Sequence, residues 1–241
     1  MNKLAIIGYG KMGKMVEKYA KDFNFEICTI IDPVFNNKIT TSELKDAEVA
    51  IEFTTPESAV KNYKTLLECG INIVTGTTGW YSEINKIKAL VSKSKQGFFY
   101  ASNFSIGMNI MFELNRYLSR IIGNIDNYTL SINETHHTKK LDKPSGTAVS
   151  LAMDIIENQD RYKTWKLSNN SIAETDIPIT SNREGEVIGI HTVEYRSPID
   201  KISIEHEAFT RDGFAIGALT ACRYMLKKQG IHTMQDLLKF H

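Results

Sequence analysis

The sequence predicts an α/β protein of two domains, in which a doubly wound parallel sheet is followed by an α+β domain with a mixed or antiparallel sheet. Three observations predict this. In residues 1–106, short apolar runs alternate with segments of helical spacing. The first apolar run ends in a glycine-rich loop. Beyond residue 106, apolar and polar residues alternate within strands, as they do in a sheet with one exposed face.

The composition is typical of a globular chain. Hydrophobic residues make up 42% of the 241 residues and charged residues 24%, and the formal net charge is +1. This balance does not favour a nucleic-acid or membrane surface, and no apolar run approaches the roughly 18 residues of a membrane span. Cys28, Cys69 and Cys222 lie far apart in the sequence. We therefore expect them to be buried free thiols in a reducing cytosol. We therefore expect a cytoplasmic protein that acts on a small molecule, without a nucleic-acid or membrane partner.

The first domain is expected to contain five strands and the helices between them. The strands are short apolar runs, typical of strands buried on both faces of a parallel sheet. Met12, Val16 and Phe23 recur at helical spacing after the first run, and Pro56 suits a first helical turn after the third. The predicted strands are 3–8, 26–31, 47–53, 71–74 and 97–101, and the predicted helices are 12–23, 56–68 and 82–94.

The second domain is expected to combine three alternating strands with helices. In the first of these strands, Leu130 and Ile132 alternate with polar residues, which indicates a half-exposed sheet. The predicted strands are 128–134, 186–195 and 200–209, and the predicted helices are 107–122 and one that begins near 145. A last predicted helix, 213–226, could pack on either domain.

The domain boundaries follow from this change of pattern. We expect residues 1–106 and 212–241 to form the first domain and residues 107–211 to form the second. The stretch 158–184 is polar and weakly patterned, so it is expected to be a long loop, and the sequence does not reveal its role.

The loop GYGKMG, residues 8–13, has the spacing of a dinucleotide-binding turn. A strand precedes it, an amphipathic helix follows, and Asp32 ends the next strand, where an acid would bind the adenosine ribose. Gly8 permits the tight turn, Gly10 lets a pyrophosphate approach the backbone, and Gly13 lets helix and strand pack closely. The phosphates would meet the N–H groups and the positive dipole at the start of the helix, whereas a glycine turn without a ligand is the alternative. A Rossmann-like domain is thus predicted to bind NADH or NADPH through Gly8, Tyr9, Gly10, Lys11, Met12, Gly13 and Asp32.

The residue after Asp32 bears on the choice of nucleotide. Pro33 stands there, not an arginine, so no cation at that position meets a 2′-phosphate. This favours NAD over NADP, although Lys11 and Lys38 are cations that could reach the phosphate. Both cofactors therefore stay open.

Two further polar loops follow predicted strands of the first domain. Residues 75–80 (TGTTGW) follow the fourth strand and residues 101–109 (ASNFSIGMN) follow the fifth. Each could be an ordinary turn between strand and helix. In an open parallel sheet, however, ligands bind beyond the carboxyl ends of the strands, and glycine and hydroxyl residues there suit a nicotinamide ribose or carboxamide.

The segment ETHHTKKLDKPSGTA, residues 134–148, is the second candidate site. A metal site is disfavoured, because adjacent histidines on a strand point to opposite faces and no ligand spacing is evident nearby. His191 and His206 could join a metal site only through tertiary contact.

An anion site fits this segment better than a metal site. Lys139, Lys140 and Lys143 place positive charge beside the histidines. A helix starts after Pro144, and its free N–H groups at Gly146 and beyond are a natural seat for a carboxylate or phosphate. Histidine and lysine could also supply protons. A solvated basic loop with a capped helix is the alternative.

These motifs together resemble the dihydrodipicolinate reductase family of the diaminopimelate–lysine pathway. The resemblance is ordered along nearly the whole chain, and the pattern E-x-H-H-x-x-K-x-D-x-P-S-G-T is highly specific to that family. A non-catalytic dinucleotide sensor or another dehydrogenase would leave the His-His-Lys-Pro-Ser-Gly-Thr run unexplained. The matching segments are GYGKMG, Asp32, EFTTPE (52–57), GTTG (76–79), ASNFSIGMN, ETHHTKKLDKPSGTA, REGEVIGIHTVEY (183–195) and IEHEAFTRDGFAIGA (204–218).

The resemblance implies a role for each matching residue. His136 would donate and accept the proton in catalysis, Lys140 would donate a proton, and His137 would contact the substrate. Gly146 and Thr147 would hold one carboxylate of a cyclic dicarboxylate, while the cofactor delivers a hydride to C4 of its ring. The family also forms a homotetramer through the sheet of its second domain. The cofactor would be held by residues 8–13 and Asp32, and by Gly76, Thr77, Thr78, Ala101, Ser102, Asn103 and Phe104.

The sequence departs from the family pattern at a few positions. Lys143 stands where alanine is usual, and Ser102 and Met108 are mild variants. Pro33 leaves dual use of NADH and NADPH in doubt. None of these departures touches the proposed proton donors or the carboxylate seat.

Overall fold

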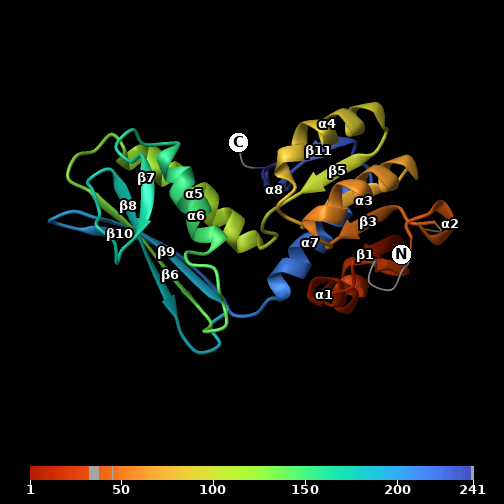
Figure 1. The fold of residues 1–241 in the computed structure, drawn as a ribbon, viewed down its shortest axis with the longest axis horizontal. Coiled ribbons are helices and arrows are strands. Elements are labelled where there is room, and N and C mark those ends of the chain that lie inside the picture. Colours follow the sequence, from red (N-terminus) through yellow and green to blue (C-terminus); the bar gives the residue numbers. More distant parts are fainter. Residues whose placement is uncertain (33–37, 45, 240–241) are drawn as a thin grey trace. The chain divides into compact units, whose positions relative to one another are not determined.

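The computed structural model describes residues 1–32, 38–44 and 46–239 of the chain, which divides into two compact units (Figure 1). Unit 1 comprises Met1–Ile106 and Asp212–His241, and unit 2 comprises Gly107–Arg211. In the described part of the chain, no helix has the length and apolar character needed to cross a membrane.

Unit 1 is built on a parallel sheet of six strands in the order β11-β5-β4-β3-β1-β2. The five strands predicted from the sequence are confirmed. The sixth, β11, was not predicted, because a run of three residues carries no recognisable pattern. The strands are β1 (Asn2–Ile7), β2 (Phe25–Ile31), β3 (Val49–Glu52), β4 (Asn72–Thr75), β5 (Gly97–Tyr100) and β11 (Gly230–His232).

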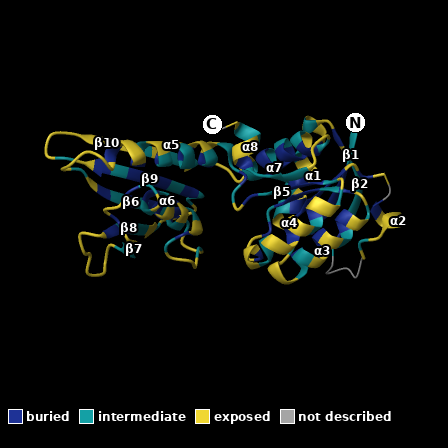
Figure 2. Ribbon diagram, turned by 90° about the horizontal axis from the view of Figure 1, so that it is seen from above, coloured by how far each residue is buried: buried dark blue, intermediate teal, exposed yellow. Residues whose placement is uncertain are grey.

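Helices cover both faces of this sheet, because alternate residues of each strand enter two separate cores. Leu4 and Ile6 pack with α1, α7 and α8, whereas Ala5 and Ile7 pack with α3 and α4. The strands of this sheet accordingly appear dark blue to teal in Figure 2, and the outer faces of the helices appear yellow. The helices are α1 (Lys11–Tyr19), α2 (Thr41–Leu44), α3 (Pro56–Glu68), α4 (Ile84–Lys93), α7 (Asp212–Met225) and α8 (Met234–Leu238), with 3-10 turns at Ala20–Phe23 and Tyr81–Glu83.

Unit 2 contains a mixed sheet of five strands in the order β10-β9-β6-β8-β7. The pairs β6/β8 and β7/β8 are parallel, and the pairs β6/β9 and β9/β10 are antiparallel. Two helices pack on one face of the sheet and bury its apolar side chains. The elements are α5 (Ile106–Ile122), β6 (Thr129–His136), α6 (Gly146–Ile156), β7 (Thr164–Leu167), β8 (Asp176–Arg183), β9 (Gly189–Arg196) and β10 (Lys201–Ala208).

The expectation of a long loop at 158–184 is wrong, because this stretch contains β7 and β8. Ile177 and Ile179 of β8 are fully buried beneath the helices. Pro178 between them is unfavourable in most strands, and the second half of β8 is polar, so the strand pattern was hidden. That polar half reaches the end of the sheet where the candidate site lies.

Candidate active site

The glycine loop of unit 1 joins β1 to α1 and is shaped by close backbone packing. Gly8 has φ +91°, and a Cβ there would lie 2.1 Å from the carbonyl oxygen of Phe53. A Cβ on Gly13 would lie 2.3 Å from the carbonyl oxygen of Gly8. Gly10 differs, because no described atom lies within 4 Å of the place its Cβ would take. Two glycines are therefore required by the fold, whereas Gly10 leaves the loop open to a ligand.

The start of α1 offers hydrogen-bond donors beside an acid. Gly10 is the N-cap residue and has no side chain with which to cap the first turn. The carboxylate of Asp32 accepts a hydrogen bond of 2.8 Å from the backbone N–H of Tyr9, which places the acid against the glycine loop. Lys11 and Lys38 are exposed, and Pro33 lies outside the described residues.

The loop after β4 rests on a buried polar network. Thr75 donates to the carboxylate of Glu52 at 2.6 Å and is bonded to the hydroxyl of Tyr63 at 2.9 Å. Burial raises the pKa of Tyr63 above its usual range, so this hydroxyl stays neutral. The hydroxyl of Thr77 accepts from the N–H of Thr54 at 2.9 Å. The network is part of the framework, and it leaves Gly76 half-buried and Thr78 exposed at the edge of the sheet.

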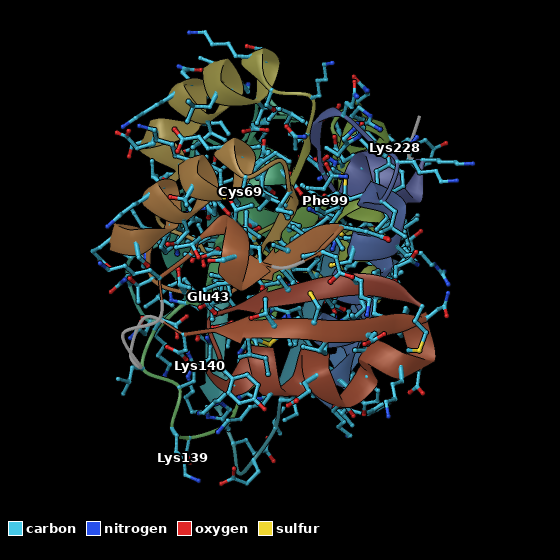
Figure 3. All side chains as sticks on the ribbon, turned by 90° about the vertical axis from the view of Figure 1, so that its right-hand side faces the viewer. Glu43, Cys69, Phe99, Lys139, Lys140 and Lys228 are labelled. Carbon is cyan, nitrogen blue, oxygen red and sulfur yellow. The ribbon has the colours of Figure 1, made fainter. Side chains whose placement is uncertain are left out.

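The loop after β5 divides into structural and accessible residues. The side chain of Phe104 is buried, stacks on Phe99 and meets Phe53 edge to face. Phe99, which is labelled in Figure 3, is itself fully buried. Ala101 is buried as well, whereas Ser102 is exposed. A ligand could therefore touch Phe104 only through its backbone.

In unit 2, the sheet face beneath the helices changes from apolar to polar at one end. Glu134 and His136 follow Ile132 at every second residue of β6 and therefore face the same side. The partner of Glu134 is His191 on β9, and on the other side Ser181 on β8. We call these four residues, with Arg183 and Ser145, the polar end of the unit 2 sheet: Glu134, Ser145, Ser181, Arg183, His136 and His191.

Glu134 is the centre of this polar end. Its Oε1 accepts from the backbone N–H of Ser145 at 2.9 Å and from the hydroxyl of Ser181, and lies 3.5 Å from Nη1 of Arg183. Its Oε2 lies 3.3 Å from Nδ1 of His136 and 3.7 Å from Nε2 of His191. One carboxylate thus joins three strands to the start of α6.

Glu134 is held in its charged form. Burial alone would favour the neutral acid. The nearby ring of His136 and the hydrogen bonds from Ser145 and Ser181 outweigh burial and lower the pKa of this carboxyl well below its usual range.

His191 is neutral beside this anion. Burial lowers the pKa of His191 to about 4, and the neighbouring His136 acts in the same direction. The two rings meet edge to face with centroids 4.9 Å apart. The hydroxyl of Ser145 lies 3.2 Å from Nε2 of His191 and accepts from the N–H of Ala148, which caps α6.

The cap on α6 is selective. Ser145 occupies the N–H of Ala148, not those of Gly146 and Thr147. Apart from its chain neighbours and the backbone of its own helix, no described atom lies within 4 Å of the place a Cβ on Gly146 would take. The start of α6 therefore presents backbone donors to an open space, and Glu134 anchors it through Ser145.

The two central lysines of the loop differ in their surroundings. Lys140 keeps 24% of its side-chain exposure and pairs with Asp142 at 2.8 Å, whereas Lys139 keeps 76% and pairs with the equally exposed Glu186 at 3.0 Å. Figure 3 shows Lys139 nearer the outer end of the loop. Burial acts against the charge on Asp142, but the Lys140 ammonium lowers the pKa of that carboxyl. The ammonium group of Lys140 is therefore held in position, whereas that of Lys139 is solvated.

Arg183 clamps the loop that carries these lysines. Its Nε donates to the carbonyl oxygen of Lys140 at 3.2 Å, and its Nη2 donates to that of Asp142. The N–H of Glu184 donates to the carbonyl oxygen of His136 at 2.8 Å. The end of β8 and its following turn thus fix the position of the loop that carries Lys140.

The adjacent histidines have different partners. His136 is buried beside Glu134, whereas His137 is half-buried with its Nε2 3.1 Å from Nη2 of Arg211. In the described residues, the side chains that bring metal-ligating atoms within 4.8 Å of one another are Glu134, His136 and His191. Arg183 disfavours a cation there, because its positive charge already lies beside the carboxylate.

Sequence patterns assigned no role to Glu134, Ser181 or Arg183, and they offered His191 only as a metal ligand. The sequence did contain a hint for His191, because it lies at every second residue with the buried Val193 and Tyr195 of β9 and therefore faces the same side of the strand.

Two of the departures from the family pattern lie in unit 2. Lys143 is exposed, and nothing in the structure explains it. Met108 is buried in the core of unit 2, so that departure from the family pattern concerns packing.

Family models match nearly the whole chain. The model described as dihydrodipicolinate reductase, N-terminus, matches residues 2–104, and the model described as dihydrodipicolinate reductase, C-terminus, matches residues 107–238.

Named relatives and a solved structure agree with these models. A 4-hydroxy-tetrahydrodipicolinate reductase from Christiangramia forsetii is 43% identical over 237 residues, which cover 98% of this chain and 97% of the relative. A relative of the same name from Rickettsia rickettsii is 33% identical over 95% of each chain. The structure of dipicolinate-bound dihydrodipicolinate reductase from Paenisporosarcina sp. TG-14 has a TM-score of 0.79 at 22% identity and covers 97% of both chains, which shows the same fold.

Proposed function

The chain belongs to the dihydrodipicolinate reductase family, and from this premise we propose how its residues serve the reaction. The reaction is the NAD(P)H-dependent reduction of 4-hydroxy-tetrahydrodipicolinate to tetrahydrodipicolinate, a step toward diaminopimelate and lysine. The roles of individual residues below are our proposals.

Unit 1 fits a nicotinamide dinucleotide. The open approach at Gly10 and the uncapped start of α1 suit a pyrophosphate, and Asp32 beside the loop suits a ribose hydroxyl. When bound, the nicotinamide supplies the hydride that reduces C4 of the substrate ring. The residues proposed to hold the dinucleotide are Gly8, Tyr9, Gly10, Lys11, Met12, Gly13, Asp32, Gly76, Thr77, Thr78, Ala101, Ser102, Asn103 and the backbone of Phe104.

NADH is the proposed preferred cofactor. The carboxylate of Asp32 accepts hydrogen bonds from a ribose hydroxyl, whereas a 2′-phosphate would bring like charges together. Lys11 and Lys38 are the exposed cations that could offset this repulsion. Titration of the protein with NADH and NADPH measures the preference directly.

Unit 2 is proposed to bind the dicarboxylate and supply protons. The free N–H groups of Gly146 and Thr147 receive one carboxylate, and His137 contacts the substrate. His136 donates and accepts a proton through its ring, and Lys140 donates a proton from its ammonium group. The positive charge of the loop also offsets the two negative charges of the substrate.

We also propose a homotetramer that forms through unit 2. β10 is an edge strand, exposed or half-buried along its length, and the apolar side chains of Ile199 and Phe209 near its ends are exposed. Such an edge is normally covered by another strand or chain. Light scattering of the purified protein should give four times the mass of one chain.

The observation that carries the proposed chemistry is the anchoring of His136 and the start of α6 by one buried carboxylate. It supports the proposal because His136 and the proposed carboxylate seat share the same framework. The test is a coupled assay in which the condensing synthase supplies 4-hydroxy-tetrahydrodipicolinate and loss of NADH is followed. Turnover is expected. Dinucleotide binding without turnover would instead favour a non-catalytic sensor.

A further inference from the structure

We propose that Glu134 is a positioning residue that fixes the tautomer of His136, so that Nδ1 keeps its hydrogen and Nε2 exchanges protons. This rests on the proposed role of His136 as the proton donor and acceptor. Glu134 touches neither substrate nor cofactor in this proposal and acts through the histidine.

The two oxygens of Glu134 have separate tasks. Oε1 receives the donors that fix the carboxylate in place, which are the N–H of Ser145, the hydroxyl of Ser181 and the guanidinium of Arg183. Oε2 faces the histidines and lies 3.3 Å from Nδ1 of His136. Both Oε2 and this Nδ1 are buried, and neither makes a regular hydrogen bond within the described residues. When the ring becomes charged, Nδ1–H and Oε2 move closer together and form a charge-assisted hydrogen bond.

The charge on Glu134 determines the tautomer. An ionised carboxylate only accepts hydrogen bonds, so the ring nitrogen that faces it must carry the hydrogen. His136 Nδ1–H therefore points at Oε2, and Nε2 is the atom that gains and loses a proton. In the donating step, the Nε2–H bond breaks, the proton passes to the substrate, and the electron pair remains on Nε2 while Nδ1–H is unchanged.

The surroundings of the His136 ring support this orientation. A Cβ on Gly189 would lie 3.0 Å from Nε2 of His136, so glycine at this position leaves room for the ring. The neutral ring of His191 packs edge to face against it. These contacts restrain the ring, and Glu134 determines which nitrogen carries the hydrogen.

Glu134→Gln should reverse the tautomer while preserving the shape of the side chain. The donors from Ser145, Ser181 and Arg183 require an oxygen on their side, so the NH₂ of glutamine must face His136. A donor at this place meets a bare Nδ1, and the ring hydrogen moves to Nε2. Such a ring cannot accept a second proton without placing two donors against each other, so proton delivery fails.

The experiment compares wild type, Glu134→Gln and the control Glu186→Gln, which alters an exposed glutamate of the same region. Nitrogen-15 NMR of the imidazole rings, assigned with His136→Gln, should show His136 with hydrogen on Nδ1 in wild type and control, and on Nε2 in Glu134→Gln. The kcat of Glu134→Gln should fall about 10²-fold, within the range of a placed acid–base group. Its KM for the dicarboxylate and its affinity for NADH should stay within about twofold of wild type.

Ser181→Ala separates positioning from general anchoring. It removes a donor on the Oε1 side and leaves the Oε2 side unchanged, so the tautomer should remain that of wild type. An unchanged tautomer in Glu134→Gln, or the same tautomer change in Ser181→Ala, would overturn the proposal. The NMR result holds whether or not the protein turns over the substrate, so a failure of the proposed function remains distinguishable from a failure of this one.

Discussion

The candidate sites of the two units are built from different parts of the chain. In unit 1 the site is made of backbone: glycines that allow close packing, an uncapped helix start and one acid beside it. In unit 2 the site combines the start of α6 with side chains on three strands, and these converge on the buried carboxylate of Glu134. The first should therefore be sensitive to steric change, and the second to loss of charge or of a proton.

This difference suits the two proposed tasks. A dinucleotide brings its own chemistry, so its site needs shape and donors. A proton-transfer site needs groups of defined charge held at fixed positions. Burial strengthens the electrostatic interactions of each charge. The predictions below test this contrast, from the largest expected effect to the smallest.

The largest effect is expected from Lys140→Ala in unit 2. The substitution removes the half-buried cation paired with Asp142, and kcat/KM should fall about 10²- to 10⁴-fold, as expected for the loss of a placed proton donor. Lys139→Ala is the matched control, because Lys139 is exposed and its pair with Glu186 is worth little. It should change kcat/KM by less than about threefold. Steady-state kinetics at several salt concentrations provide the measurement; equal losses in both variants would show that bulk charge matters and not a placed donor.

The next effect is steric and belongs to unit 1. Gly8→Ala introduces a Cβ at positive φ, 2.1 Å from a backbone oxygen, and should lower the free energy of unfolding by about 3 kcal/mol. Gly10→Ala introduces a Cβ into open space, so it should leave stability unchanged and weaken NADH binding. Denaturant unfolding and a fluorescence titration distinguish the two. A large stability loss in Gly10→Ala would contradict the division between framework glycines and the ligand-facing glycine.

The two sites also differ in how far they could be predicted from the sequence. The glycine loop was predictable, because strand, loop and helix are contiguous and Asp32 follows at a regular spacing. The start of α6 was predictable for the same reason, and Ser145 does cap it. The partners Ser181 and His191 of Glu134 were not, because they lie 47 and 57 residues further along the chain and meet it only through strand register. No local pattern encodes that register, and β8 itself was hidden by its proline and polar second half.

A smaller effect should appear in the pH dependence of stability, and it comes from unit 2. The pKa of His191 is lowered from 6.5 to about 4 in the folded protein, so the unfolded chain takes up the proton first as the pH falls. This group makes no difference to stability above pH 6.5, and destabilises the fold progressively between pH 6.5 and 4. At pH 5 the loss from this group should be about 2 kcal/mol relative to pH 7.5.

Urea unfolding of wild type and His191→Asn at pH 7.5 and 5 isolates this contribution. The asparagine side chain does not titrate in this range, so the stability of the variant should fall less over the same interval. Glu134 does not interfere, because its lowered pKa affects stability only below pH 4.5. Parallel losses in the two proteins would show that His191 is not held neutral.

The smallest effect is expected at the acidic group of the unit 1 site. Asp32→Asn removes the negative charge beside the glycine loop but keeps an oxygen that can accept the N–H of Tyr9. Repulsion of a 2′-phosphate should therefore decrease, and the ratio of NADPH to NADH affinity should rise about tenfold, equivalent to about 1.4 kcal/mol. Titrations of wild type and variant with both dinucleotides at low salt give this ratio. Its dependence on salt is part of the test, because an effect of charge should shrink as salt screens it. An unchanged ratio would mean that Lys11 or Lys38 already offsets the carboxylate, and the unit 1 site would then select its ligand by shape alone.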